Sequence, residues 1–234
     1  MQPDTTMLSP LTERFSISTE NKDLKTIFSE NKELLIQYKI EPDPTSQNVN
    51  KFLHHIIWDG NYTLVKEIIG AMSDLGLIKQ YTQLYQAIRD EEKGIETLRK
   101  LLEEGVNPNG CNVHDRPSLT PIKIAQRQYE FYKKLNPKNI VFKNEYEQQL
   151  GMTKEQWEQH TNAYFSRLKE EYENIYQLLK KYIFEEDSPL MVARKLKNYA
   201  AMQLLLDHGA YDSLNSARQQ LEKIETQKQR LSKE

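Results

Sequence analysis

The sequence predicts an all-α fold made of repeated helix-turn-helix units, with a helical cap at each end. The block from Ser188 to Ala210 fits one such unit without a gap, and three further segments align with it. Only eight glycines occur in 234 residues, which argues against a turn-rich β protein. The third unit is interrupted by a long segment with helical periodicity of its own. Together these observations predict a helical repeat protein that carries a helical insertion.

Before the repeats, the sequence predicts a flexible leader and a helical cap. Residues 1–19 show no sustained hydrophobic period, so we expect no regular structure there. Between residues 20 and 44, apolar residues recur at spacings that suit one broken helix or two short ones, and Pro42 and Pro44 end the pattern. We interpret residues 20–44 as an N-terminal cap, because the first unit of a repeat stack has an outer face that must be covered.

The block from Ser188 to Ala210 carries the clearest helix signals. Ser188 can cap free backbone amides, and Pro189 suits the first position of a helix. Gly209 suits the left-handed conformation that ends a helix. Apolar residues between these signals recur on one face of each helix. The residues expected to face inward are Leu190, Val192, Ala193, Ala201, Met202, Leu204 and Leu205.

Three further segments match this block. Lys51 to Ile69 aligns without a gap, and Thr82 to Val106 aligns with two extra residues between its helices. The third match is split, with Thr120 to Ala125 as its first helix and Glu173 to Leu179 in its second. Each match keeps apolar residues at the inward positions of the block. Because one such unit buries little surface alone, we expect residues 45–211 to form one stack.

These units resemble ankyrin repeats. The ending LLEEGVNPNG, from Leu101 to Gly110, is similar to the end of such a repeat, and Thr120-Pro121 is similar to its start. The chain departs from the family at Lys51-Phe52, where ankyrin repeats have Thr-Pro, and at Tyr85, where they have histidine. The resemblance implies a solenoid of about four divergent repeats whose concave face binds a protein partner.

The resemblance also implies which residues line the concave face. They lie in the turn before each first helix and late in that helix. Carried over by position, the candidate protein-binding residues are Trp58, Asp59, Tyr81, Arg89, Asp90, Asp115, Arg116, Arg127, Asp187 and Lys195. Mixed charge beside aromatic anchors is typical of protein interfaces, although each charge could equally be a solvated surface residue. Trp58 is the strongest candidate, with packing against the next repeat as its alternative.

The insertion in the third unit separates this chain from a plain repeat stack. In an alignment without a gap from Thr120, the second helix comes about 42 residues later than the block requires, and the added segment spans about residues 126–172. Thr153 to Gln156 matches a capping box and opens a periodic segment that continues to Tyr182. We expect this long helix to pair antiparallel with a helix that runs from Pro121 toward Leu135.

The aromatic residues of the insertion have two interpretations. Residues 129–182 hold eleven of the 22 aromatic residues in the chain. An aromatic stripe at helical spacing is most often core, which favours a hairpin with its own small core. Alternatively, part of the hairpin projects and exposes aromatic anchors for a partner, with Trp157 as the best candidate. The sequence leaves open whether the hairpin projects or covers the concave face.

A small thiol-dependent enzyme or modifier is the alternative function. Cys111 and His114 share the loop before the third unit and have the residue types of a thiol nucleophile site. The loop lacks a helix start that would lower a thiol pKa, so we expect no catalytic activity. His54 and His208 have structural places in the repeat pattern. One cysteine with dispersed histidines lacks the spacing of a zinc site, and we expect neither a metal nor a cofactor.

Composition narrows the partner and the compartment. A net charge of −2 gives no reason to expect nucleic acid as a partner. No run of about 18 apolar residues occurs, so we expect no membrane span. The single cysteine points to no oxidising compartment. These features predict a cytoplasmic protein with a protein partner, and they leave its oligomeric state open.

The composition also resembles that of secreted ankyrin effectors of intracellular bacteria. The shared features are many Asn, Gln, Lys and Tyr residues, divergent repeats, and a tail at residues 212–234 rich in Lys, Glu and Gln. This resemblance implies a host-cell protein as partner, secretion without a cleavable signal peptide, and a tail that acts as the secretion signal. Within the tail, Ser216 to Leu231 has a thin apolar stripe and is predicted to form a helix.

Overall fold

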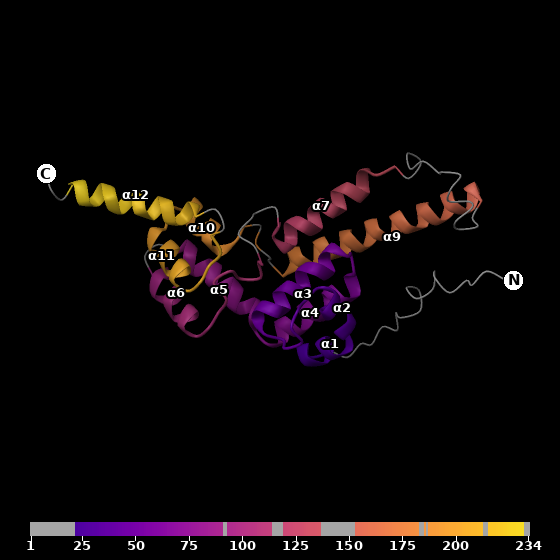
Figure 1. The fold of residues 1–234 in the computed structure, drawn as a ribbon, viewed down its shortest axis with the longest axis horizontal. Coiled ribbons are helices and arrows are strands. Elements are labelled where there is room, and N and C mark those ends of the chain that lie inside the picture. Colours follow the sequence, from indigo (N-terminus) through magenta and orange to yellow (C-terminus); the bar gives the residue numbers. More distant parts are fainter. Residues whose placement is uncertain are drawn as a thin grey trace.

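The computed structural model describes the chain as a set of helices. The described residues are 22–90, 93–113, 119–136, 153–182, 185, 187–212 and 215–231, and they form eleven α-helices without a strand. The predicted all-α class is confirmed for these residues, while the predicted leader lies outside them. Figure 1 shows an elongated arrangement in which α12 (Ser216–Leu231) extends from one end, and α7 (Pro121–Lys134) with α9 (Lys154–Lys181) from the other.

The predicted N-terminal cap region contains two short helices, α1 (Leu24–Glu30) and α2 (Lys32–Gln37). The Asp23 side chain accepts a hydrogen bond from the Thr26 amide at 2.7 Å and so starts α1. α1 packs on α4 (Tyr62–Asp74), and Phe28 meets Phe52 edge to face with ring centroids 5.3 Å apart. The sequence expectation of one broken helix or two short ones therefore resolves into two.

The first two predicted units are helix pairs, but their first helices start earlier than the alignment places them. α3 (Ser46–Trp58) pairs with α4, and α5 (Leu77–Arg89) pairs with α6 (Gly94–Glu103). Thr45 caps α3 by accepting from the Asn48 amide at 3.3 Å, and Gly76 precedes α5 in the left-handed conformation. The aligned starts, Lys51 and Thr82, therefore lie inside helices. This corrects the predicted starts of both units.

The last unit has the predicted helix-turn-helix form. α10 (Pro189–Lys195) begins after Ser188, whose hydroxyl accepts from the Met191 amide at 3.3 Å. α11 (Tyr199–Asp207) follows and ends before Gly209, which has a φ of 87°. The seven residues predicted to face inward are all buried. α12 then packs on α11 as the predicted C-terminal helix.

The insertion forms the predicted antiparallel hairpin of α7 and α9, which lie side by side. α9 has 28 residues, and its start has the full capping box. The Thr153 hydroxyl accepts from the Gln156 amide at 3.3 Å, and the Gln156 side chain accepts from the Thr153 amide at 2.9 Å. At about 1.5 Å per residue, α9 spans roughly 42 Å. Its first half therefore extends well beyond the helices of the first unit, as Figure 1 shows.

The helix pairs do not stack in chain order. α7 packs on α3 and α9 on α4, whereas α10 packs on α5 and α11 on α6. A stack in chain order would instead place α7 and α9 beside α5 and α6. Gly110, in the loop after α6, lies beside α3, where the Asn50 side chain donates a hydrogen bond of 2.8 Å to its carbonyl. The third unit thus packs on the first unit and not on the second, an order that the prediction of one stack did not specify.

The helices form two halves: α1–α4 with α7 and α9, and α5 and α6 with α10–α12. Buried apolar residues form one continuous core through both halves. α4 and α5 connect the halves, with Ile68 and Leu84 fully buried on these two helices. Among the helices of the described residues, none is long and apolar enough to cross a bilayer. The core thus holds the helix pairs together and leaves the far part of the hairpin outside the body (Figure 1).

Candidate functional site

Tyr172 attaches the hairpin to the first unit. It is buried on α9, and its hydroxyl donates a hydrogen bond to the backbone carbonyl of Trp58. Its ring lies so close to Gly60 that a Cβ there would be 3.0 Å from the ring, and Gly60 has a φ of 70°. The adjacent Glu171 accepts from the Tyr62 amide at 3.3 Å. We call these contacts the hairpin root.

Trp58, Asp59 and Arg127 gather at the hairpin root. Trp58 is half-buried, and the Arg127 guanidinium of α7 lies 5.1 Å from the centre of its ring. The Asp59 carboxylate accepts from the Tyr38 hydroxyl, and the Tyr38 ring stacks on His55 at 4.5 Å. Trp58 therefore packs beneath the hairpin, whereas the sequence offered the next repeat as its packing partner.

Stacked tyrosines form the inner face of the hairpin. Tyr129 stacks on Tyr176 with ring centroids 6.4 Å apart, and Tyr132 stacks on Tyr172 at 5.3 Å. Burial raises the pKa of Tyr172, which keeps its hydroxyl protonated as a donor. Glu173 accepts from the Tyr129 hydroxyl at 3.4 Å. This part of the aromatic stripe is the predicted hairpin core.

Four aromatic side chains extend from this core to the surface of both helices. On α7, the ring centroids of Phe131 and Tyr132 lie 5.1 Å apart. The Tyr132 centroid lies 6.0 Å from that of Phe165 on α9, which lies 5.3 Å from that of Tyr164. Phe131 is 55% exposed and Tyr164 is 44% exposed. We call these four residues the aromatic patch. Trp157, which the sequence favours as the exposed anchor, is half-buried on α9.

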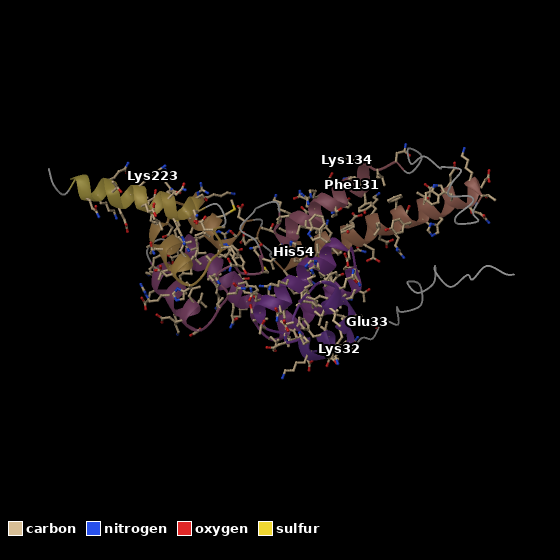
Figure 2. The ribbon with its side chains drawn as sticks, in the orientation of Figure 1. Lys32, Glu33, His54, Phe131, Lys134 and Lys223 are labelled. Carbon is tan, nitrogen blue, oxygen red and sulfur yellow. The ribbon has the colours of Figure 1, made fainter. Side chains whose placement is uncertain are left out.

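The sequence reasoning did not single out Phe131. Tyr129 and Tyr132 are three residues apart and face inward. Phe131 directly precedes Tyr132, so it is out of phase with the inner face. Figure 2 shows Phe131 on α7 together with Lys134. A large apolar residue out of phase with the buried stripe of a predicted helix is the signal that would have found it.

The charged concave-face candidates of the second half are paired within the chain. The Arg89 guanidinium donates two hydrogen bonds of 2.9 Å to the Glu185 carboxylate, which raises the pKa of Arg89. The Lys195 ammonium lies 2.5 Å from the Asp187 carboxylate. The Tyr85 hydroxyl donates to the Asp187 carbonyl at 2.9 Å. Arg89 and Tyr85 thus attach Glu185 and Asp187 to α5.

Two further concave-face candidates have structural roles. Tyr81 is 4% exposed, and its hydroxyl lies 3.0 Å from the Ser46 hydroxyl and 3.4 Å from the Asn50 amide nitrogen. The prediction that Tyr81 lies on a surface is wrong. It was placed in the turn before the helix, but α5 starts at Leu77, so Tyr81 lies within the helix and faces the core. Asp90 accepts from the Lys93 amide at 3.1 Å, next to the start of α6.

Cys111 is a buried thiol. It lines a small depression with Tyr81, Tyr85 and Tyr182, and Glu185 stands at the same place. Burial raises the pKa of the Cys111 thiol to about 12, and the charge of Glu185 adds to the effect. A thiol nucleophile needs the opposite shift. His114, the proposed partner of Cys111, lies outside the described residues, as do the candidates Asp115 and Arg116.

Both histidines to which the sequence gives a structural interpretation make contacts inside the fold, although His54 lies late in α3 and not at a helix start. His54 is buried on α3, and the ring of His208 lies 2.8 Å from the Leu204 carbonyl at the end of α11. Figure 2 shows His54 in the body of the molecule near the hairpin. In the described part of the chain, no group of three His, Cys, Asp or Glu side chains is placed to hold a metal ion.

No family model, curated protein or solved structure matches this chain. Function must therefore be inferred from the geometry of the chain itself. That geometry contains two groups of candidate residues. The concave-face candidates in the described residues lie mostly in internal contacts, and the aromatic patch is open to solvent.

Proposed function

We propose that this chain is a non-catalytic protein-binding module, or adaptor, that holds its partner on the inserted hairpin. The aromatic patch is the observation that carries the proposal, because it joins two exposed rings across two helices through half-buried neighbours. Exposed aromatic residues that form a continuous surface are typical anchors of protein interfaces. The hairpin is therefore favoured over the concave face as the binding element.

The state of the concave-face candidates supports this choice. Arg89 and Lys195 are each held by a carboxylate of the chain, and Trp58 lies beneath Arg127. A partner that used Trp58 would have to displace Arg127, and one that used Arg89 would compete with its two hydrogen bonds to Glu185, whereas the exposed pair of Lys195 with Asp187 is weak. Asp59 also has an internal donor, Tyr38. A partner that docks on the aromatic patch meets no such cost.

The proposed role of the helix pairs is to hold the hairpin in a fixed position. We regard α3/α4, α5/α6 and α10/α11 as divergent ankyrin-like repeats, on the strength of the helix signals in the last unit and the apolar positions that all units keep. The hairpin root joins this base through Tyr172 and Glu171. In this proposal the repeats are a scaffold and the insertion supplies the specificity.

The proposed partner belongs to a host cell, as the resemblance to secreted ankyrin effectors implies. In this proposal the chain acts in the host cytoplasm, and residues 212–234 carry the secretion signal. A reporter fusion with and without these residues tests the point in a bacterium that has the matching secretion system. Equal translocation of both fusions would remove the secretion part of the proposal and leave the binding surface unaffected.

Capture of partners from a host-cell lysate tests the binding surface. We expect the double variant Phe131→Ser/Tyr164→Ser to lose the proteins that the native chain retains. Ile36→Ser is the matched control, because Ile36 is 76% exposed on α2, outside the aromatic patch. Arg89→Ala/Lys195→Ala tests the concave face in the same way. Loss of capture in this second variant, with none in the patch variant, would reverse the assignment.

A further inference from the structure

The charges around the aromatic patch are strongly one-sided. Within four residues of the patch on either helix, the sequence holds five cations and one carboxylate, although the whole chain has a net charge of −2. The cations are Arg127, Lys133, Lys134, Arg167 and Lys169, and the carboxylate is Glu130. The patch is therefore an apolar surface with a basic border on a slightly acidic protein.

Most of this positive charge remains at the surface after internal contacts are considered. Arg127 turns toward Trp58 at the hairpin root, and the Lys133 ammonium lies 5.3 Å from the centre of the Tyr129 ring while its side chain stays exposed. Glu130 lies 3.8 Å from Lys134, whose side chain is 79% exposed. The Arg167 guanidinium lies 5.6 Å from the Tyr164 ring, at the border of the patch itself. The exposed ion pair of Lys134 with Glu130 is weak and leaves the Lys134 ammonium accessible to a partner.

Just outside this four-residue window α9 carries further carboxylates: Glu158 lies 4.0 Å from Lys154, Glu170 is exposed beside Lys169, and Glu171 and Glu173 are turned away from the patch. Glu171 accepts from the Tyr62 amide of α4, and Glu173 accepts from the Tyr129 hydroxyl. Their carboxylates therefore serve the hairpin root and the inner face of the hairpin. Within four residues of the patch, cations therefore outnumber carboxylates.

From this arrangement we infer that the aromatic patch binds an acidic amphipathic helix of the partner protein. An apolar stripe of such a helix would cover Phe131 and Tyr164, and carboxylates at its edges would meet Lys133, Arg167 and Lys169. Two antiparallel helices present a face on which a third helix packs, which favours a helical segment over a flat bilayer surface. The inference rests on the proposed function and specifies the chemistry of the partner.

Binding of two synthetic helical peptides to the full chain tests the inference. One peptide has leucine on one face and glutamate on the other, and its match has lysine in place of glutamate. By fluorescence anisotropy, we expect the acidic peptide to bind roughly tenfold more tightly than the basic one, and Arg167→Glu/Lys169→Glu to remove that preference. Lys79→Glu/Lys228→Glu, exposed on α5 and α12, is the control for net charge and should keep the preference.

Three results would overturn the inference: equal affinity for both peptides, binding of neither, or a preference that survives Arg167→Glu/Lys169→Glu. Binding to phosphatidylserine vesicles in place of the acidic peptide would assign the patch to a membrane, and dimers that the Phe131→Ser variant cannot form would assign it to a second copy. Circular dichroism checks that each variant keeps its helices. If Phe131→Ser/Tyr164→Ser abolishes capture while the peptide preference is absent, the proposed function stands and this inference fails.

Discussion

The last unit and the inserted hairpin are both antiparallel helix pairs, but they use their large side chains in opposite ways. In α10 and α11, every residue predicted to face inward is buried, and small or aliphatic side chains fill the interface. In α7 and α9, tyrosines make the interface, and the aromatic surface continues outward to Phe131 and Tyr164. The regular unit therefore buries the side chains of its interface, whereas the hairpin leaves two of its aromatic rings exposed.

The largest effect should come from the core of the regular unit. Leu205 is fully buried on α11, so Leu205→Ala should lower the free energy of unfolding by about 2–5 kcal/mol. Phe131→Ala in the hairpin should change it by less than about 0.5 kcal/mol, because the side chain is exposed. Urea unfolding followed by circular dichroism measures both. Similar losses in the two variants would contradict the assignment of scaffold and surface.

The next effect concerns the glycine at the hairpin root. Gly60→Ala combines a left-handed backbone with a Cβ only 3.0 Å from Tyr172, so we expect a loss of about 1–3 kcal/mol. Gly209→Ala is the control in the regular unit, since it has φ of 87° with open space around it, and should lose about 1 kcal/mol. In a Tyr172→Ala background, Gly60→Ala should cost no more than Gly209→Ala. If the excess persists there, Tyr172 is not its cause.

A smaller effect should follow from loss of one hydroxyl. Tyr172→Phe removes the donor to the Trp58 carbonyl and should cost about 1 kcal/mol, while the ring contact with Tyr132 remains. Native-state hydrogen exchange should show faster opening of α9 than of α11. Uniform acceleration in both helices would mean that the hairpin and the scaffold unfold as one unit.

The smallest effect is on the pH dependence of stability, through the Cys111 thiol, and it is absent at neutral pH. Because burial raises the pKa of Cys111 to about 12, above its ordinary value of 9.0, the folded chain keeps a proton that the unfolded chain loses as the pH rises. Its contribution is fully present below pH 9 and is lost as the pH rises through about 12. Stability of the native chain should therefore fall more steeply between pH 9 and 11 than that of Cys111→Ala. At pH 8 the native thiol should react with a disulfide reagent far more slowly than the unfolded chain.

The sequence predicted the local structure well because the signals for it are local. Ser188 and Thr153 cap the helices where their side chains indicated, and the period from Thr153 onward is one continuous helix. Apolar spacing predicts which face of a helix is buried. It contains no information on which neighbour covers that face, so the packing of α7 and α9 on α3 and α4 was not predicted.

The same limit explains the errors at the candidate site. Tyr81 was assigned to a turn because the repeat alignment ignores the extra turn at the start of α5, which places the residue in the core. The residues of the aromatic patch belong to a segment for which the repeat pattern has no counterpart. Only the phase of Phe131 relative to Tyr132 could have identified the exposed edge from sequence.

Tyr172 lies in the C-terminal half of α9, so most of this helix extends beyond the hairpin root. Measured along the helix axis from Tyr172, where α9 is attached, Lys154 lies roughly 27 Å away and Tyr164 only about 12 Å away. A tilt of about 10° would move the start of α9 by about 5 Å and the ring-bearing segment by about 2 Å. A partner seated near this attachment would thus keep its contacts while the distal end of the helix swings.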